Sequence, residues 1–98
     1  MKKTDKTADG TSFHNVTIKT TINKLTDALG HPQHYYNDGE DKVNVEWVCE
    51  TEGGDVVTIY DWKEYRTIGV DEKIEFHLGG HNKMSTLEAK EQLVQILK

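Results

Sequence analysis

Five side chains that can carry positive charge gather in the second half of the sequence: Lys63, Arg66, His77, His81 and Lys83. The two histidines bracket a Gly-Gly pair, where the absence of Cβ atoms would let backbone N–H groups approach an anion. A helix expected to begin at Ser85 would direct the positive end of its dipole toward the same region. This combination favours a site for a phosphate-bearing small molecule. The alternative is an ordinary glycine turn among surface charges.

Aromatic side chains accompany these cations in the sequence. Tyr60, Trp62 and Tyr65 lie directly before or between the basic residues, and rings of this kind stack on flat groups such as nucleobases. The alternative places Tyr60 and Trp62 in a second, minor core beneath the loops. The predicted ligand-binding residues are Tyr60, Trp62, Lys63, Tyr65, Arg66, His77, Gly79, Gly80 and His81.

Catalytic groups are present without a spacing that enforces catalysis. His77 with Glu75 or Asp61 could form an acid–base pair, and Cys49 or Ser85 could act as a nucleophile. Cys49 lies in an alternating apolar run, which is typical of a buried small hydrophobic residue. We therefore predict a protein that is not an enzyme, with no catalytic residues. Nucleotide hydrolysis is the least disfavoured reaction.

Two histidine pairs raise the question of a metal site. Two residues separate His31 from His34, and three residues separate His77 from His81. The second spacing would offer two zinc ligands on a helix, but the intervening glycines disfavour a helix. With one cysteine in the chain, neither pair completes a structural zinc pattern. We expect no metal and no cofactor.

The composition limits the classes of partner. A net charge of −5 over 98 residues does not match the positive surface that nucleic-acid coating requires. Residues 1–10 contain lysines with no apolar stretch after them, unlike a secretory signal. No apolar run approaches the roughly 18 residues of a spanning helix. We predict a cytoplasmic protein that binds neither membranes nor nucleic acids.

The periodicity of apolar residues predicts the elements that position these groups. Residues 1–11 are polar and aperiodic and predict a disordered tail, and residues 12–98 predict one α+β domain. A helix should begin at Thr20 or Thr21 and end at Leu29, before Gly30. A second should begin at Ser85, where the S-x-x-E spacing indicates a capping box. Strands are expected at residues 13–18, 43–50, 55–62 and 74–78.

The predicted fold is an antiparallel β-meander of three to four strands, with the N-terminal and C-terminal helices packed on one face. Alternation gives this core face as Val43, Val45, Trp47, Val57, Ile59, Ile74, Phe76 and Leu78. The opposite face would carry Glu46, Val48, Thr58, Tyr60, Trp62, Glu75 and His77. Exposed aromatic residues of this kind mark contact surfaces. That face is either a ligand site or the interface of a homodimer.

Two stretches carry a resemblance to a known group of proteins. They are Thr58–Tyr65, which contains YDWKEY, and His77–His81, which reads HxGGH. Through these motifs the chain resembles small proteins encoded by tailed bacteriophages. The resemblance covers residues 12–97. A weaker resemblance, limited to a helix followed by Leu29-Gly30-His31-Pro32 and a meander, is to the β-lactamase-inhibitor-like architecture. That second resemblance implies only a fold analogy, because the chain lacks that group's secretory signal and disulfides.

The phage resemblance implies a role in taking over the host or countering its defence, in the cytoplasm of an infected bacterium. The leading hypothesis is a non-enzymatic binding protein that sequesters a small anionic ligand such as a nucleotide. The alternative is an acidic inhibitor that blocks a host protein through the loop Asp38–Asp41 and the open sheet face. A structural component of the virion is a third class with no specific support in the sequence.

Overall fold

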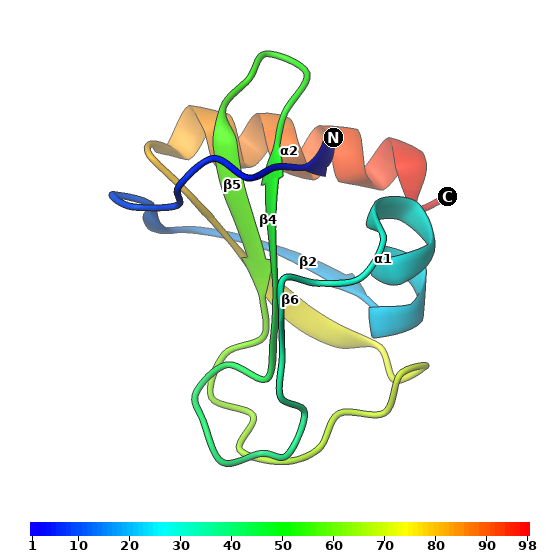
Figure 1. Ribbon diagram of the computed structural model, residues 1–98. Coiled ribbons are helices and arrows are strands. Elements are labelled where there is room, and N and C mark those ends of the chain that lie inside the picture. The colour runs from blue at the N-terminus through cyan, green and yellow to red at the C-terminus, as the bar shows by residue number, and fades with distance from the viewer.

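The computed structural model describes all 98 residues and shows an α+β fold (Figure 1). In chain order the elements are β1 (Lys2–Lys3), β2 (Ser12–Thr20), α1 (Ile22–Leu29), β3 (His34–Tyr35), β4 (Val45–Glu50), β5 (Val56–Tyr60), β6 (Ile74–Gly80) and α2 (Lys83–Ile96). The sheet runs in the order β1-β4-β5-β6-β2, and β3 also pairs with β4. All pairs are antiparallel. The fold class is confirmed, but six strands replace the expected three to four.

The meander β4-β5-β6 is extended by β2, which pairs with β6. Between Phe13 and Val16 the register shifts, and Asn15 adopts a positive φ of 68°, as in a β-bulge. Phe13 therefore lies opposite Gly79, whereas Val16 lies opposite Leu78. Because direct partners share a face of the sheet, the bulge sends Phe13 outward and Val16 into the core.

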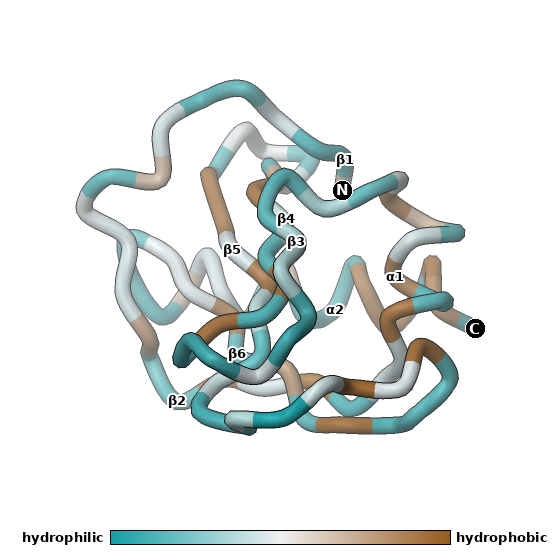
Figure 2. Tube along the Cα trace, turned by 60° about the horizontal axis from the view of Figure 1, so that its bottom comes forward, coloured by the Kyte–Doolittle hydropathy of each residue, from teal (hydrophilic) through white to brown (hydrophobic).

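One hydrophobic core lies between the sheet and both helices, as expected. Leu25 of α1 and Leu93 of α2 belong to the same buried cluster as Trp47 and Phe76, and all four are fully buried. The Trp47 indole N–H donates to the carbonyl of Gly30 at 2.9 Å, which ties β4 to the end of α1. In Figure 2 the hydrophobic residues lie mainly in the helices, β5 and β6, while the segment between β1 and β2 is mostly hydrophilic.

Two expected core positions need comment. Cys49 is fully buried, as predicted. Val43 is not part of the core. It precedes β4, which begins at Val45, and it lines a pocket on the opposite face of the sheet. The predicted strand begins two residues too early, because the alternation of apolar residues continues before Val45.

The N-terminal segment differs from the expected disordered tail. Lys2 and Lys3 form β1 against β4, and Met1 packs against the core. The Thr4 N–H donates to the Val48 carbonyl at 3.0 Å. Residues 4–11, which we call the N-terminal strap, then cross the sheet on the face opposite the helices before entering β2 (Figure 1). No local periodicity predicts this path, because the contacts that hold the segment to the sheet are made with β4, which is distant in the sequence.

Ion pairs hold the strap to the sheet. Lys6 pairs with the Glu50 carboxylate at 2.8 Å, and Lys2 pairs with the same carboxylate at 3.3 Å. These neighbours hold the pKa of Glu50 below its usual value. Two of the three lysines of the predicted disordered tail therefore share one carboxylate on β4, and the third, Lys3, donates to the His31 carbonyl at 2.7 Å.

The predicted start is right for the first helix and wrong for the second. Thr21 caps α1 by accepting from the Lys24 N–H at 3.0 Å, as expected. The predicted start of the second helix at Ser85 is wrong, because α2 begins at Lys83 and Asn82 is its N-cap. The Asn82 side chain accepts from the Ser85 N–H at 2.8 Å. Asparagine is as good a cap as serine, and here it comes earlier in the chain.

A buried polar pair, Asn44 and Asp61, fixes the loops at one end of the sheet. Both side chains are fully buried. Asp61 accepts from the N–H groups of Asn44 and Val45 at 2.8 and 2.9 Å, and from the Asn44 side chain at 3.0 Å. The Asn44 amide also donates to the Arg66 carbonyl and accepts from the Gly39 N–H, both at 3.0 Å. Asp61 thus has a structural role, and its oxygens are occupied.

We expect Asp61→Ala to lower the free energy of unfolding by about 3 kcal/mol, because it leaves several buried N–H donors without an acceptor. Asp61→Asn should cost less, since its oxygen can still accept from the backbone. Asp41→Ala, at an exposed site, should stay within about 0.5 kcal/mol of the parent protein. Urea denaturation measures all three. A parental midpoint for Asp61→Ala would contradict the structural role of this carboxylate.

Candidate functional site

Four rings form an aromatic cluster on the outer face of the sheet: Phe13, Tyr60, Trp62 and His77. Phe13 stacks on His77 with ring centroids 4.0 Å apart and planes 13° apart. Trp62 lies on a nearly parallel plane, 28° from His77, at 6.3 Å. Tyr60 stands edge-on to both, at 5.5 Å from His77 and 6.2 Å from Trp62. The stack is therefore tight at Phe13 and loose at Trp62.

The register of the strands brings this cluster together. Tyr60 lies directly opposite His77 across β5 and β6. Phe13 is diagonal to His77, because its direct partner is Gly79. Trp62 follows Tyr60 by two residues and continues on the same side beyond the end of β5. Of the four rings, only Phe13 was absent from the predicted site, because its orientation depends on the bulge at Asn15.

The cluster is partly open to solvent and is not a closed minor core. Trp62 is 41% exposed and Phe13 is 38% exposed. The Lys63 ammonium lies 5.5 Å from the centre of the Trp62 ring, within cation–π range. Burial lowers the pKa of His77, with Glu75 opposing the shift. His77 therefore acts mainly as a neutral ring near pH 7, and Lys63 is the cation of the cluster.

A pocket of about 260 Å³ lies between the aromatic cluster and the N-terminal strap. Its lining combines strap residues, two rings of the cluster and polar groups from β4 and β5: Ala8, Thr11, Ser12, Val43, Glu46, Thr58, Tyr60, Trp62 and Gly79. Drug-sized ligands occupy roughly 300–1,000 Å³. This pocket is thus suited to a single ring system or a side chain.

Gly79 contributes space to this pocket. A Cβ atom at this position would overlap the Thr58 hydroxyl oxygen and would lie 3.5 Å from the Tyr60 ring. The Thr58 hydroxyl is itself buried. The absence of a side chain at Gly79 therefore lets the Thr58 and Tyr60 side chains pack directly against β6.

Glu46 is the acidic group of the pocket. It lies directly opposite Tyr60 on β4. Burial raises the pKa of the Glu46 carboxyl, and nearby His34 opposes this shift. Burial also raises the pKa of Tyr60, with a further contribution from Glu46. No hydrogen bond from the chain acts on the Glu46 carboxylate.

The predicted cations do not converge. Arg66 forms a bidentate pair with Glu72 and lies near Glu64 at 3.8 Å. These carboxylates raise its pKa and neutralise its charge locally. His81 is exposed beside Gly10 of the strap. Of the predicted cations, His77 belongs to the cluster as a ring, and Lys63 contacts the cluster through Trp62.

Two further predicted features differ from expectation. Tyr65 is 54% exposed, has a positive φ of 50° and makes no ring contact with the cluster. Gly79 and Gly80 belong to β6, with β5 on one side and β2 on the other, so they do not form the expected open N–H cradle. A Cβ at Gly80 would lie 2.8 Å from the Ser85 hydroxyl. That glycine serves the packing of α2 against the sheet.

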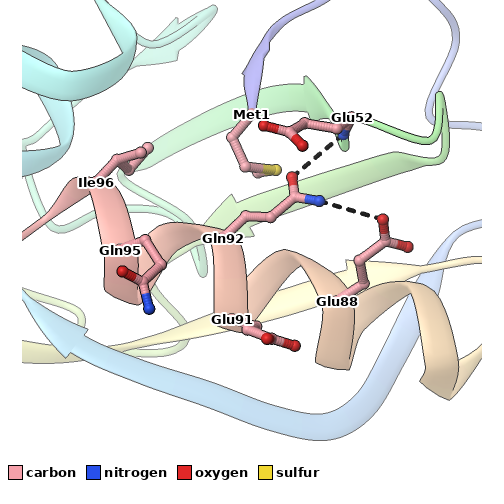
Figure 3. A pocket seen from close by; sticks show the side chains of 7 residues that line it. All are labelled: Met1, Glu52, Glu88, Glu91, Gln92, Gln95 and Ile96. Carbon is pink, nitrogen blue, oxygen red and sulfur yellow. Dashed lines mark hydrogen bonds between the residues drawn. The ribbon is translucent and has the colours of Figure 1, made fainter.

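A second hollow, of about 370 Å³, lies beside α2 (Figure 3). Its lining is Met1, Glu52, Glu88, Glu91, Gln92, Gln95 and Ile96. Gln92 bridges it by accepting from the Glu52 N–H at 3.2 Å and donating to Glu88 at 3.1 Å. Three glutamates without a lysine or arginine in the lining do not suit an anionic ligand. No three metal-binding side chains gather in the structure as a metal site would require.

Glu46, Val43 and the strap residues of the pocket were missed by sequence reasoning. The strap has no sequence signal for its position, whereas Glu46 could have been found, because the predicted register already placed it on the same face as Tyr60.

No protein-family model, no curated protein and no solved structure matches this chain. Neither α1 nor α2 has the length and apolar content that a bilayer-spanning helix needs.

We expect Gly79→Ala to destabilise the fold by about 1–3 kcal/mol through overpacking against the Thr58 hydroxyl. Thr58→Ala removes the atom that the new Cβ would strike. The double variant should therefore lose less stability than the sum of the single variants. Urea denaturation of the four proteins gives this coupling. Strict additivity would show that the Thr58 hydroxyl is not the obstacle.

The two outward glutamates of β4 should give opposite pH dependences. Burial raises the pKa of the Glu46 carboxyl above 4.5, so the folded state holds this proton more tightly than the unfolded state. The fold therefore loses stability as pH rises from 4.5 through the raised pKa. The pKa of Glu50 is lowered below 4.5, so its contribution appears as pH rises to 4.5. Relative to the parent, Glu46→Gln should gain stability with increasing pH and Glu50→Gln should lose it. Unfolding curves across a pH series test this, and the same sign for both variants would contradict it.

Proposed function

We propose that the chain is a non-enzymatic binding module that holds a nucleotide at the aromatic cluster and the adjoining pocket. The observation that carries the proposal is the half-exposed ring of Trp62, which ends a stack of parallel rings and also lines a cavity. Base–aromatic stacking contributes about 1–3 kcal/mol per base. Such a site needs few additional contacts to hold a single base.

Each residue then has a defined role in the site. Trp62 provides the stacking face, Tyr60 forms a side wall because its ring lies at 81° to Trp62, and Phe13 and His77 support both rings. Lys63 contacts the phosphate, since it lies beside Trp62 and has no carboxylate partner among the ion pairs of the chain. Arg66 and Tyr65 are outside this site, and Gly79 contributes space.

Three residues considered for catalysis have other roles in the structure, which supports a binding role. Burial raises the pKa of Cys49 to about 12, and the thiol lies in the core. Asp61 is occupied by three N–H donors. Ser85 lies within α2, where its hydroxyl donates to the Asn82 carbonyl. Neither Cys49 nor Ser85 is therefore well placed as a nucleophile, and the Asp61 carboxylate is not free to act as a base. Sequestration of a nucleotide against host defence, in an infected bacterium, remains the biological setting that we propose from the phage resemblance.

A protein partner is the second candidate. Tyr35 and Tyr36 are 48% and 67% exposed, and exposed tyrosines are frequent anchors of protein interfaces. They adjoin the acidic segment Asp38–Asp41, so an inhibitor would present rings and negative charge to a basic host protein. This surface is built by the loops at the end of the sheet and does not need the pocket.

Nucleotide binding should depend on Lys63 and not on Arg66. With a nucleoside monophosphate at 100 times its dissociation constant, the parent protein should gain about 2.7 kcal/mol of stability. Lys63→Gln should weaken binding about tenfold, which lowers this gain by about 1.4 kcal/mol. Arg66→Gln is the matched control, because that guanidinium is already paired with Glu72. Thermal unfolding with and without nucleotide measures the difference.

Two results would contradict the proposal. One is a melting temperature that no nucleotide changes. The other is an equal loss of binding in the Lys63 and Arg66 variants, which would indicate general electrostatic attraction. A bacterial protein that remains bound in the presence of nucleotide, and is released by salt, would favour the second candidate.

A further inference from the structure

The pocket beside the aromatic cluster contains one charged group, and that group is an acceptor. Glu46 lines the cavity with Tyr60 and Trp62, and no lysine or arginine lines it. Among the titratable groups that act on Glu46, His34 is the one that favours its charged form. The Glu46 side chain is half-buried and accepts no hydrogen bond from the chain, so its carboxylate oxygens are free to accept from a ligand. A ligand that supplies donors would complete it.

The walls of the pocket restrict the shape of that ligand. Tyr60 and Trp62 provide flat apolar surfaces, and Val43 adds an aliphatic one. Gly79 and Ala8 take up little space on the sheet and strap sides. A planar group with its edge toward Glu46 and one face against Trp62 fits these boundaries, with the Tyr60 ring at 81° to Trp62 as a side wall. Thr58 adds a mostly buried polar residue to the lining.

Carboxylates form their strongest contacts with two adjacent N–H donors, because each oxygen then accepts one hydrogen bond. The guanine base has such an edge, formed by the ring N1–H and the neighbouring exocyclic amine. Adenine and cytosine each place an acceptor nitrogen beside their amine, and a carboxylate, which only accepts, repels it. Uracil has one N–H between two carbonyl oxygens. Guanine is therefore the base that complements an ionised Glu46.

We propose that this pocket reads the base of the ligand and selects guanine through a bidentate contact with Glu46. The inference rests on the proposed nucleotide-binding function and adds the identity of the base. Stacking on Trp62 is tolerant of sequence, since every base has an aromatic face. Discrimination then comes from Glu46, because a wrong base would place an acceptor against a half-buried carboxylate.

Calorimetric titration of the full chain with guanosine, inosine and adenosine monophosphates tests this selection. The guanosine nucleotide should bind at least about tenfold more tightly than the adenosine nucleotide. Inosine monophosphate keeps the ring N–H and lacks the amine, so its affinity should be intermediate. Glu46→Gln should bring the guanosine-to-adenosine ratio close to one. Glu75→Gln, which removes an exposed carboxylate of the same face outside the pocket, should preserve the ratio.

The outcomes separate this inference from the function on which it rests. If all three nucleotides bind equally, or if Glu46→Gln keeps the preference, the base selection is wrong and nucleotide binding stands. If none binds, both are wrong. Methylguanidinium serves as a probe for the basic side chain of a protein partner. Binding of methylguanidinium that needs Glu46, without binding of any nucleotide, would overturn both and assign the pocket to such a partner.

Discussion

The hydrogen bonds between Asn44 and Asp61 are the constraint on which the functional end of the molecule depends. They join the start of β4 to the residue that follows β5, and the Asn44 amide reaches the Arg66 carbonyl and the Gly39 N–H in the two neighbouring loops. The Asn37 side chain adds a second link, since it both donates to and accepts from the backbone of Ile68 at 2.7 Å. Because Asp61 is fixed between Tyr60 and Trp62, the two rings project from one face with a defined separation. A buried polar pair thus positions a surface site.

Crowding at β6 shapes the opposite side of that site. Gly79 faces outward, beneath Thr58 and Tyr60, and Gly80 faces inward, beneath Ser85 and Thr86 at the start of α2. Neither glycine has the positive φ that a turn would require. Both are needed because other side chains occupy the space of a Cβ. The motif HxGGH therefore encodes close packing on the two faces of one strand, and the pocket is a result of this packing.

The sequence predicts the parts of the fold that have a local pattern, and it fails where contacts are distant. Alternation identified the strands around Trp47, Ile59 and Phe76, and helical spacing identified α1, because each pattern reflects one buried face. β1 and β3 have two residues each, which is too short for any periodicity. In the candidate site, Tyr60, Trp62 and His77 came together because alternation placed them on one face. The pairing of Arg66 with Glu72 depends on the path of a loop, which no local pattern predicts.

The bulge at Asn15 has a consequence for association between copies of the chain. β2 is nine residues long and pairs with β6 on one side only, so its other side is an edge of the sheet. Long regular edges are templates for strand addition. The bulge interrupts this edge near its start, and the exposed Lys19 adds charge near its end. At the other edge, β1 and β3 offer only two residues each. Growth of the sheet from molecule to molecule is therefore disfavoured at both margins, and self-association would have to use a face.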